Sequence, residues 1–195
     1  MNSPILIDIP EELRGEKVLV RPYRPGDGAD LNEAIASSRD HLKTWMPFAH
    51  DHQTVEESEE LVRRFRAKWI LREDFAYAYW SLETGELLGS SGLHRIDWDV
   101  RKFEIGYWIR ASAEGKGYVT DLVRVLCRLA FDTLEANRVF IRCGVENKRS
   151  AAVPERVGFE LEGVLRNDGK KPDGTLFDMM VWGMTRERWF SLRSP

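Results

Sequence analysis

Apolar residues recur along the chain with two periods, and these periods predict two kinds of element. Alternation of apolar and polar residues, bounded by turn-forming residues, predicts strands at 17–21, 75–82, 87–96, 102–110, 138–145, 159–166 and 175–184. The turns between the three strands of 75–110 are short, so we expect these strands to pair antiparallel.

Helical spacing occurs in four segments, at 31–45, from Thr54 onward, at 118–135 and near 149–157. Thr54 and Glu57 form a capping box. The helix after them carries one apolar face, made by Leu61, Val62, Phe65 and Trp69. The strand–helix–strand order of 102–145 is a crossover, which joins parallel strands by a right-handed connection. The pattern therefore predicts an α+β (mixed α/β) fold with a mostly antiparallel sheet and one parallel pair.

The composition is that of one globular domain. A length of 195 residues suits a single domain spanning 1–195, and no repeat, low-complexity tract or linker divides the sequence. Every apolar stretch stops well short of the ~20 residues that a membrane span needs. The N-terminus lacks the features of a secretory signal, so we expect a cytoplasmic protein that does not act at a membrane.

Charge and cysteine content narrow the chemistry further. The formal net charge of −3 gives no general affinity for nucleic-acid phosphates, so any anion site must be local. Cys127 and Cys143 are too few for a disulfide framework or a zinc cage, and they suit a reducing compartment. The four histidines show no metal-ligand spacing, so no metal is expected.

The stretch EGKGYVT, residues 114–120, is the main candidate for such an anion site. A glycine turn that leads into a helix offers backbone N–H groups and the positive end of the helix dipole. The expected donors are Gly115, Lys116, Gly117, Tyr118, Val119 and Thr120. The stretch lacks the third glycine of a dinucleotide fingerprint and the Gly-Lys-Ser/Thr end of a P-loop. It can hold a phosphate group, or it can be only a structural turn.

Other segments follow in a characteristic order: VLVRPYRPGD, SRDHLKTWMPF, GLHRID, EIGYWI, NKRSAAVPERVGF, ELEGVLR and GTLFDMMVWGM. Together with the glycine turn they resemble the GNAT superfamily of acyl-CoA-dependent N-acetyltransferases, and within it the RimJ/RimL branch, which acetylates protein N-terminal amines. The resemblance covers nearly the whole chain. It implies a GNAT-like fold with helices on both faces of the sheet, and acetyl-CoA as co-substrate without a metal.

The resemblance also implies which residues bind the co-substrate. The family's pyrophosphate motif, Gln/Arg-x-x-Gly-x-Gly/Ala, lies over EGKGYV with Gly117 as its central glycine. Glu114 and Val119 depart from that motif, and we expect Glu114 to point away from the phosphates. In the family, free backbone amides on the fourth strand pair with the pantetheine arm and the thioester oxygen. These amides correspond here to Trp108, Ile109 and Arg110.

For the proton transfers, the resemblance points to one hydroxyl and one carboxylate. Ser150 matches the serine that protonates the departing thiolate, and Asn147 matches the asparagine that bonds the pantetheine arm. Asn and Ser are also favoured as helix caps, which is the structural alternative for both. Glu104 lies near the position of a catalytic glutamate in related enzymes, although it can equally be structural. Asp168 is the nearest acid to another position where part of the branch carries a glutamate.

Cys143 lies on the strand expected beside the thioester, which raises an acyl-cysteine mechanism as an alternative. On the acceptor side, the candidate wall consists of Trp45, Met46, Pro47 and Phe48, which can also belong to the core. Asp178 matches an aspartate common in the branch, and its role is either structural or substrate-facing.

The leading prediction is transfer of an acetyl group from acetyl-CoA to a primary amine by direct attack in a ternary complex. The expected acceptor is the N-terminal α-amine of a protein or peptide, such as a ribosomal protein, and a homodimer would suit the branch. Two alternatives stay open. The first is an acyltransferase for a small amine or an aminoacyl antibiotic, and the second is a non-catalytic module that senses acyl-CoA. No direct contact with nucleic acid is expected.

Overall fold

The computed structural model describes residues 3–171 and 173–193. These residues form two compact units. The first takes in the described residues up to Gly92 together with Tyr107–Leu122, and the second takes in Leu93–Gly106 together with the described residues from Val123 onward. The first unit begins with η1 (Pro4–Leu6), β1 (Leu13–Arg14), β2 (Val18–Pro22), α1 (Gly28–Ser37), α2 (Arg39–Leu42), η2 (Pro47–His50), α3 (Val55–Ile70) and β3 (Phe75–Ser81).

Three elements contribute residues to both units, namely β4 (Leu87–Asp97), β5 (Lys102–Ile109) and α4 (Tyr118–Arg128). The short helix η3 (Ala111–Ala113) precedes α4 in the first unit. The remaining elements belong to the second unit: the π-helical turn η4 (Leu129–Thr133), β6 (Arg138–Gly144), α5 (Lys148–Val157), β7 (Glu160–Lys170), β8 (Leu176–Thr185) and α6 (Arg186–Ser191).

The strands follow the hydrogen-bonded order β1-β2-β3-β4-β5-β6-β8-β7. The pairing of β5 with β6 is parallel and joins Lys102–Glu104 to Arg138–Phe140. The pairs β1·β2, β2·β3, β6·β8 and β7·β8 are antiparallel. The prediction of a mixed, mostly antiparallel sheet with one parallel crossover is therefore confirmed.

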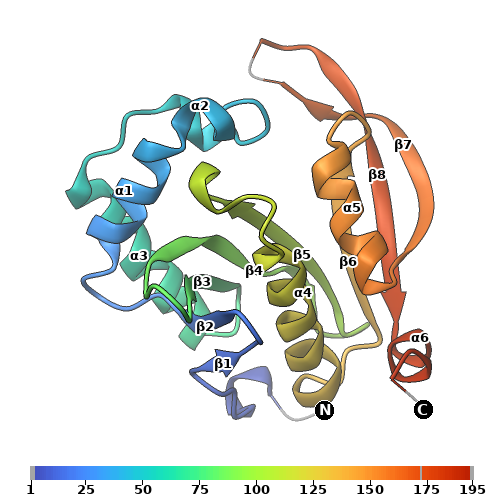
Figure 1. Ribbon diagram of the computed structural model, residues 1–195. Helices are drawn as coiled ribbons and strands as arrows, with labels where there is room; N and C mark the ends of the chain where they lie inside the picture. Colours follow the sequence, from blue (N-terminus) through green and yellow to red (C-terminus); the bar gives the residue numbers. More distant parts are fainter. Residues whose placement is uncertain (1–2, 172, 194–195) are drawn as a thin grey trace. The chain divides into compact units, whose positions relative to one another are not determined.

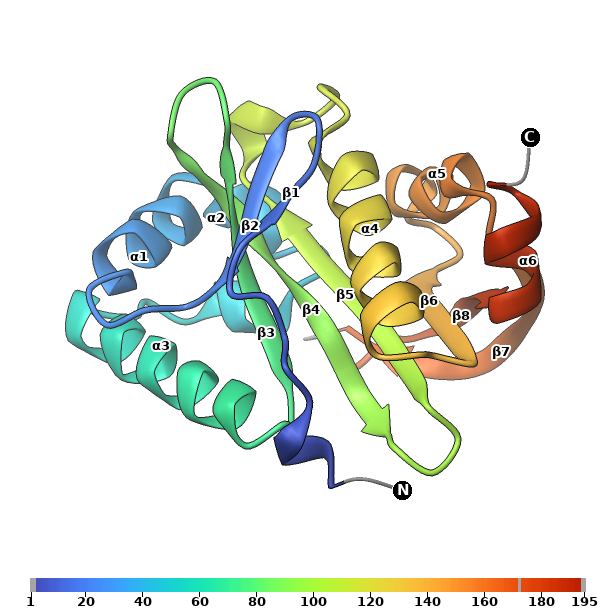
Figure 2. The same ribbon diagram turned by 90° about the horizontal axis from the view of Figure 1, so that it is seen from below.

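In the first unit, α3 packs beside α1 and β3, as Figures 1 and 2 show. The predicted capping box is present, because the Thr54 hydroxyl accepts from the Glu57 N–H and the Glu57 carboxylate accepts from the Thr54 N–H. Val62 and Trp69 are buried on the predicted apolar face of α3. Leu61 and Phe65 pack partly buried against the core of the same unit.

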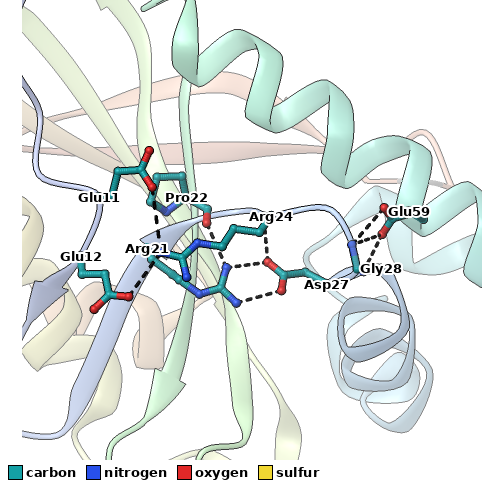
Figure 3. Close-up of polar contacts among 9 residues, drawn as sticks. Glu11, Glu12, Arg21, Pro22, Arg24, Asp27, Gly28 and Glu59 are labelled. Carbon is teal, nitrogen blue, oxygen red and sulfur yellow. Dashed lines mark hydrogen bonds and ion pairs between the residues drawn. The ribbon is translucent and has the colours of Figure 1, made fainter.

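The turn between β2 and α1 is built around two carboxylates (Figure 3). Asp27, which is buried, forms a bidentate pair with the Arg21 guanidinium at 2.7 and 2.8 Å and accepts from the Arg24 N–H at 2.8 Å. Glu59 of α3 accepts from the backbone N–H groups of Gly26 and Gly28 at 3.0 and 3.1 Å. These bonds attach the start of α1 to both β2 and α3.

In the second unit, β6, β8 and β7 lie side by side, and α5 contacts β6 and β7 (Figure 1). Val139, Ile141 and Cys143 are the buried positions of β6 that alternate with half-buried ones. Helix α5 ends at Gly158, whose φ of 99° suits a left-handed C-cap that favours glycine.

Several predicted boundaries differ from the structure. The single helix expected at 31–45 is broken at Ser38, whose hydroxyl accepts from the Ala111 N–H at 3.0 Å. The helix expected at 118–135 gives way to a π-helical turn after Arg128. Strand β7 continues to Lys170 through a bulge at Asn167, where φ is 54°, so the turn-like residues there do not end it. Helix α6 was not predicted.

Candidate functional site

The glycine turn of the first unit has the geometry of an anion-binding turn. Gly115 and Gly117 have φ values of 73° and 83°, and a Cβ at Gly115 would meet nothing within 4 Å. The turn is exposed and leads into α4. The first helical bond at this end runs from the Asp121 N–H to the Gly117 carbonyl, so the N–H groups of residues 118–120 have no partner within the helix. The turn therefore has room and donors for a phosphate group.

Two lysine side chains lie at this turn. Lys116 is exposed within it, and Lys17, from the β1–β2 connection, donates from Nζ to the Lys116 carbonyl oxygen at 2.9 Å. A Cβ on Gly117 would lie 3.4 Å from the same Lys17 Nζ. In the described part of the chain, no carboxylate forms an ion pair with either lysine. The sequence indicated Lys116 but gave no signal for Lys17, which stands 99 positions away.

Asp121, in the first turn of α4, joins the β1–β2 connection to the glycine turn. Its buried carboxylate accepts from the backbone N–H groups of Glu16, Lys17 and Val18 at 3.1, 2.8 and 3.2 Å. Gly15 makes room for this carboxylate, since a Cβ there would come within 2.2 Å of it. Asp121 was not among the predicted site residues, although an acidic residue in the first turn of a helix is a recognisable signal.

Glu114 begins the glycine turn and is turned toward α2. Its Oε1 lies 3.3 Å from Nε2 of His41, and both side chains are about 30% exposed. Position 114 is the one where the pyrophosphate motif of the resembled family carries a basic or amide residue. In this chain it carries a carboxylate that pairs with His41.

The end of β5 corrects one of the predicted cofactor contacts. The Arg110 N–H already donates to the Leu88 carbonyl oxygen at 2.8 Å, so this amide is not free for a ligand. Since successive N–H groups of an extended strand point to opposite edges, the Ile109 N–H points away from β4. The Arg110 side chain is buried and pairs with Glu33 and Glu86.

The Trp108 carbonyl oxygen accepts a hydrogen bond from a side-chain hydroxyl of β3. The Tyr79 hydroxyl donates to it at 3.0 Å, and burial raises the pKa of Tyr79 well above its usual value, so the phenol keeps its proton. Gly89 of β4 makes this approach possible, because a Cβ there would lie 2.2 Å from the Trp108 oxygen.

The predicted acceptor wall lies partly in the core of the first unit. Met46 and Phe48 pack, half-buried, against the core cluster, and the Phe48 ring lies 6.0 Å from the Trp108 ring, centroid to centroid. Trp45 is also half-buried. The structure thus brings the segment after α2 into contact with the end of β5.

In the second unit, Asn147 and Ser150 stand at the start of α5. The Asn147 side-chain oxygen accepts from the Ser150 N–H at 3.0 Å, so Asn147 caps the helix, as the structural alternative proposed. Its side-chain NH₂ group remains a donor. Burial raises the pKa of the Cys143 thiol, and hydrogen bonding from the side chain of Ser150 opposes this rise only in part. Cys143 is therefore a buried thiol in contact with Ser150.

Glu104 belongs to a chain of ion pairs in the second unit. Its two oxygens lie 2.7 Å from Nε of Arg95 and 3.0 Å from Nε of Arg142, and its side chain is 13% exposed. Arg142 also contacts Asp168 at 3.1 Å. The structure thus links the two acids that the sequence analysis considered as bases, Glu104 and Asp168, through one guanidinium.

Asp178 lies on β8 and supports the bulge of β7. Its Oδ1 accepts from the Asn167 N–H at 2.9 Å, which stabilises the left-handed conformation of Asn167 next to Asp168. Among the residues that the structure describes, no group of three His, Cys, Asp or Glu side chains could hold a metal ion. None of the described helices is long and apolar enough to cross a membrane.

Comparisons with known proteins give one consistent result. The model of the acetyltransferase (GNAT) domain family matches residues 17–160. The chain is 35% identical over 175 residues to YdaF of Bacillus subtilis, a proposed ribosomal N-acetyltransferase, covering 89% of this chain and 94% of that protein. A crystal structure described as a probable acetyltransferase has a TM-score of 0.85 at 32% identity, covering 91% of this chain and 98% of that one.

A second solved structure shares the fold at lower identity. RimL, a ribosomal-protein α-N-acetyltransferase in complex with coenzyme A, has a TM-score of 0.84 at 18% identity. The alignment covers 91% of this chain and 99% of RimL.

Proposed function

The chain belongs to the GNAT acetyltransferase family, and from this premise we propose that it transfers the acetyl group of acetyl-CoA to the N-terminal α-amine of a protein or peptide, with a ribosomal protein as the first candidate. The resemblance to RimJ/RimL enzymes and the names of the relatives support this acceptor. We further propose that the chain acts in the cytoplasm, as a single GNAT domain and as a homodimer.

The observation that carries the proposal is the exposed glycine turn at the start of α4. Its two glycines adopt left-handed φ values, a Cβ at Gly115 would meet open space, and the first N–H groups of an 11-residue helix follow. The family match spans this turn. A diphosphate suits such a turn, because several N–H donors, two lysines and the helix dipole all favour negative charge.

Acetyl-CoA would supply the activated acetyl group, and this chain's residues would bind and orient it. Gly115, Gly117 and the N–H groups of residues 118–120 would hold the pyrophosphate, with Lys116 as a cation. The backbone amide of Ile109, which points away from β4, would bind the pantetheine arm or the thioester oxygen. The Arg110 amide is left out because it is already bonded to Leu88, and the Trp108 amide is left out because it faces the same edge as that of Arg110.

For the thiolate that leaves, we propose Ser150 as the proton donor and Asn147 as a side-chain donor to the pantetheine arm. A hydroxyl at the start of α5 that already contacts a buried sulfur suits this role. The raised pKa of Cys143 disfavours its thiolate, which counts against an acyl-cysteine mechanism. Direct attack by the amine needs no covalent enzyme intermediate.

Glu104 is the proposed acceptor of the amine proton, directly or through water. Because guanidinium groups occupy both of its oxygens, water or the amine must displace one of them, and the exposed Arg95 is the easier to displace. We expect Glu104→Gln to lower kcat at least about tenfold with little change in the affinity for acetyl-CoA, because only the proton acceptor is removed. Steady-state kinetics and calorimetry of coenzyme A binding check this.

Asp168→Asn is the matched control for Glu104→Gln, because it also removes a carboxylate from Arg142 but leaves the Glu104 carboxylate in place. This control should keep a kcat close to that of the wild-type protein. Equal losses of kcat in both variants would show that the ion-pair chain is structural and that the base lies elsewhere.

On the acceptor side, we propose Trp45, Met46 and Phe48 as the wall that receives the amine, with Asp178 on β8 as a further acceptor-side residue. The contact between Phe48 and Trp108 supports the wall, because it joins this segment to the proposed thioester strand. The alternative of an acyltransferase for small amines would use the same wall.

The decisive experiment incubates the purified protein with acetyl-CoA and a set of peptides that carry ribosomal-protein N-termini, and it measures released thiol and peptide mass. We expect thiol release together with a 42 Da gain at the peptide N-terminus, the mass of an acetyl group in place of hydrogen. Acetylation of small amines alone would favour the small-amine alternative. Binding of coenzyme A with no thiol release across both panels would favour the sensor.

A further inference from the structure

We propose that Lys17 binds the pyrophosphate of coenzyme A and takes the place of the basic residue that the glycine turn lacks at position 114. This inference rests on the proposed function, since it concerns the same co-substrate. It assigns a role to a residue outside the motif, from a hairpin about a hundred positions earlier in the chain.

Lys17 is placed and partnered as a phosphate ligand would be. Its side chain is exposed, and its Nζ donates to the Lys116 carbonyl oxygen at 2.9 Å. It also lies close to Gly117, because a Cβ built there would be 3.4 Å away. An ammonium has three N–H donors. Within the described ranges only the Lys116 oxygen accepts from Nζ, so two donors are left for an anion at the turn.

The backbone of Lys17 is fixed by the helix that starts at the same turn. The Asp121 carboxylate accepts from three successive N–H groups, those of Glu16, Lys17 and Val18. On the other side, the Lys17 carbonyl oxygen accepts from the Leu82 N–H at 2.9 Å. The base of the lysine is thus held on both sides, while its ammonium stays accessible. Asp121 is therefore a positioning residue for Lys17.

The charges around the turn explain why this chain would need such a lysine. Glu114 places a carboxylate where the motif carries a basic or amide residue, and His41 is its partner at 3.3 Å. A carboxylate at that position repels a diphosphate, whereas the Asp121 carboxylate is buried against backbone donors. Lys17 and Lys116 place two positive charges at the same turn.

The test compares binding of coenzyme A and of dephospho-coenzyme A, which lacks the 3′-phosphate but keeps the pyrophosphate, by isothermal titration calorimetry. Lys17→Met should weaken both ligands alike, by about five- to tenfold, as expected for one charge-assisted contact at an exposed site. Lys17→Arg should keep most of the affinity. Lys68→Met, which removes an exposed lysine from α3, is the matched control and should change neither affinity.

The substitution Glu114→Arg adds a complementary test. Introduced into the Lys17→Met protein, it should restore affinity for both ligands, because it returns a cation to the motif position. Failure to restore either affinity would overturn the equivalence of the two positions.

Several outcomes would overturn the role of Lys17. One is a Lys17→Met protein that binds both ligands like the Lys68→Met control, and another is a loss confined to coenzyme A, which would assign the lysine to the 3′-phosphate. A wild-type protein that binds no coenzyme A would instead refute the proposed function. The two failures are therefore distinguishable.

Asp121→Asn tests the positioning role. It should weaken both ligands less than Lys17→Met does, and it should add little in the Lys17→Met background, because Asp121 acts through Lys17. Additive losses in the double variant would contradict this role. Should Asp121→Asn fail to fold, the Lys17 and Glu114 variants still decide the proposal.

Discussion

Replacement of Ser150 by alanine is expected to lower kcat by about two to three orders of magnitude, the range typical of a lost general acid, with little change in the affinity for acetyl-CoA. The main-chain N–H of residue 150, which donates to Asn147, is kept in the variant, so the cap of α5 survives. Only the hydroxyl that contacts Cys143 is removed. The loss should therefore fall on the proton transfer to the thiolate.

Steady-state kinetics with acetyl-CoA and an acceptor peptide whose N-terminal amine is free, together with calorimetry of coenzyme A binding, check this expectation. Ser191→Ala provides a control, because Ser191 lies exposed in α6 and its hydroxyl donates only to the Arg188 carbonyl oxygen. A Ser150→Ala protein with wild-type kcat would exclude the hydroxyl as proton donor. The role would then fall to water or to another hydroxyl.

Local signals account for the elements that the sequence predicted well. The capping box of Thr54 and Glu57 and the start of α4 at the glycine turn each depend on residues a few positions apart, so spacing alone reveals them. The parallel crossover was predictable for the same reason, because a strand, a glycine turn, a helix and a strand follow one another directly.

Contacts between distant residues account for what the sequence did not reveal. Lys17 and Asp121 meet across more than a hundred positions, and no spacing along the sequence indicates that they pair. The Arg110 N–H is not free for a ligand because it donates to the Leu88 carbonyl oxygen, and no local sequence pattern reveals this bond. The break at Ser38 likewise follows from a bond to Ala111 and not from a helix-breaking residue.

The resemblance predicted candidate site residues, and the structure shows which of their atoms already have partners within the protein. It indicated Asn147 as a ligand residue, and the structure adds that its side-chain oxygen caps α5, which leaves only the NH₂ group for a ligand. It indicated Glu104, and the structure adds the guanidinium partners that any reaction there must displace. Family patterns specify residue types, whereas hydrogen-bond partners depend on the packing of this chain.

Gly89→Ala is expected to cause the largest loss of stability among the variants considered. Its Cβ would lie 2.2 Å from the Trp108 oxygen, 3.0 Å from the Tyr79 hydroxyl and 3.1 Å from the Ile109 Cα. Overpacking of this kind costs about 1–3 kcal/mol, which for a protein of this size lowers the melting temperature by roughly 2–12 °C. The backbone at Trp108 and Ile109 must shift, so the affinity for coenzyme A should fall as well.

Gly163→Ala separates this steric effect from the general cost of changing a strand glycine. Gly163 lies in β7, and a Cβ there would meet nothing within 4 Å. Thermal unfolding and coenzyme A titration of the two variants should therefore differ sharply. If Gly89→Ala unfolded at the wild-type temperature and bound coenzyme A with wild-type affinity, the end of β5 would tolerate a shift. The hydrogen bond from the Tyr79 hydroxyl to the Trp108 carbonyl oxygen would then not be needed to hold the proposed thioester strand in place.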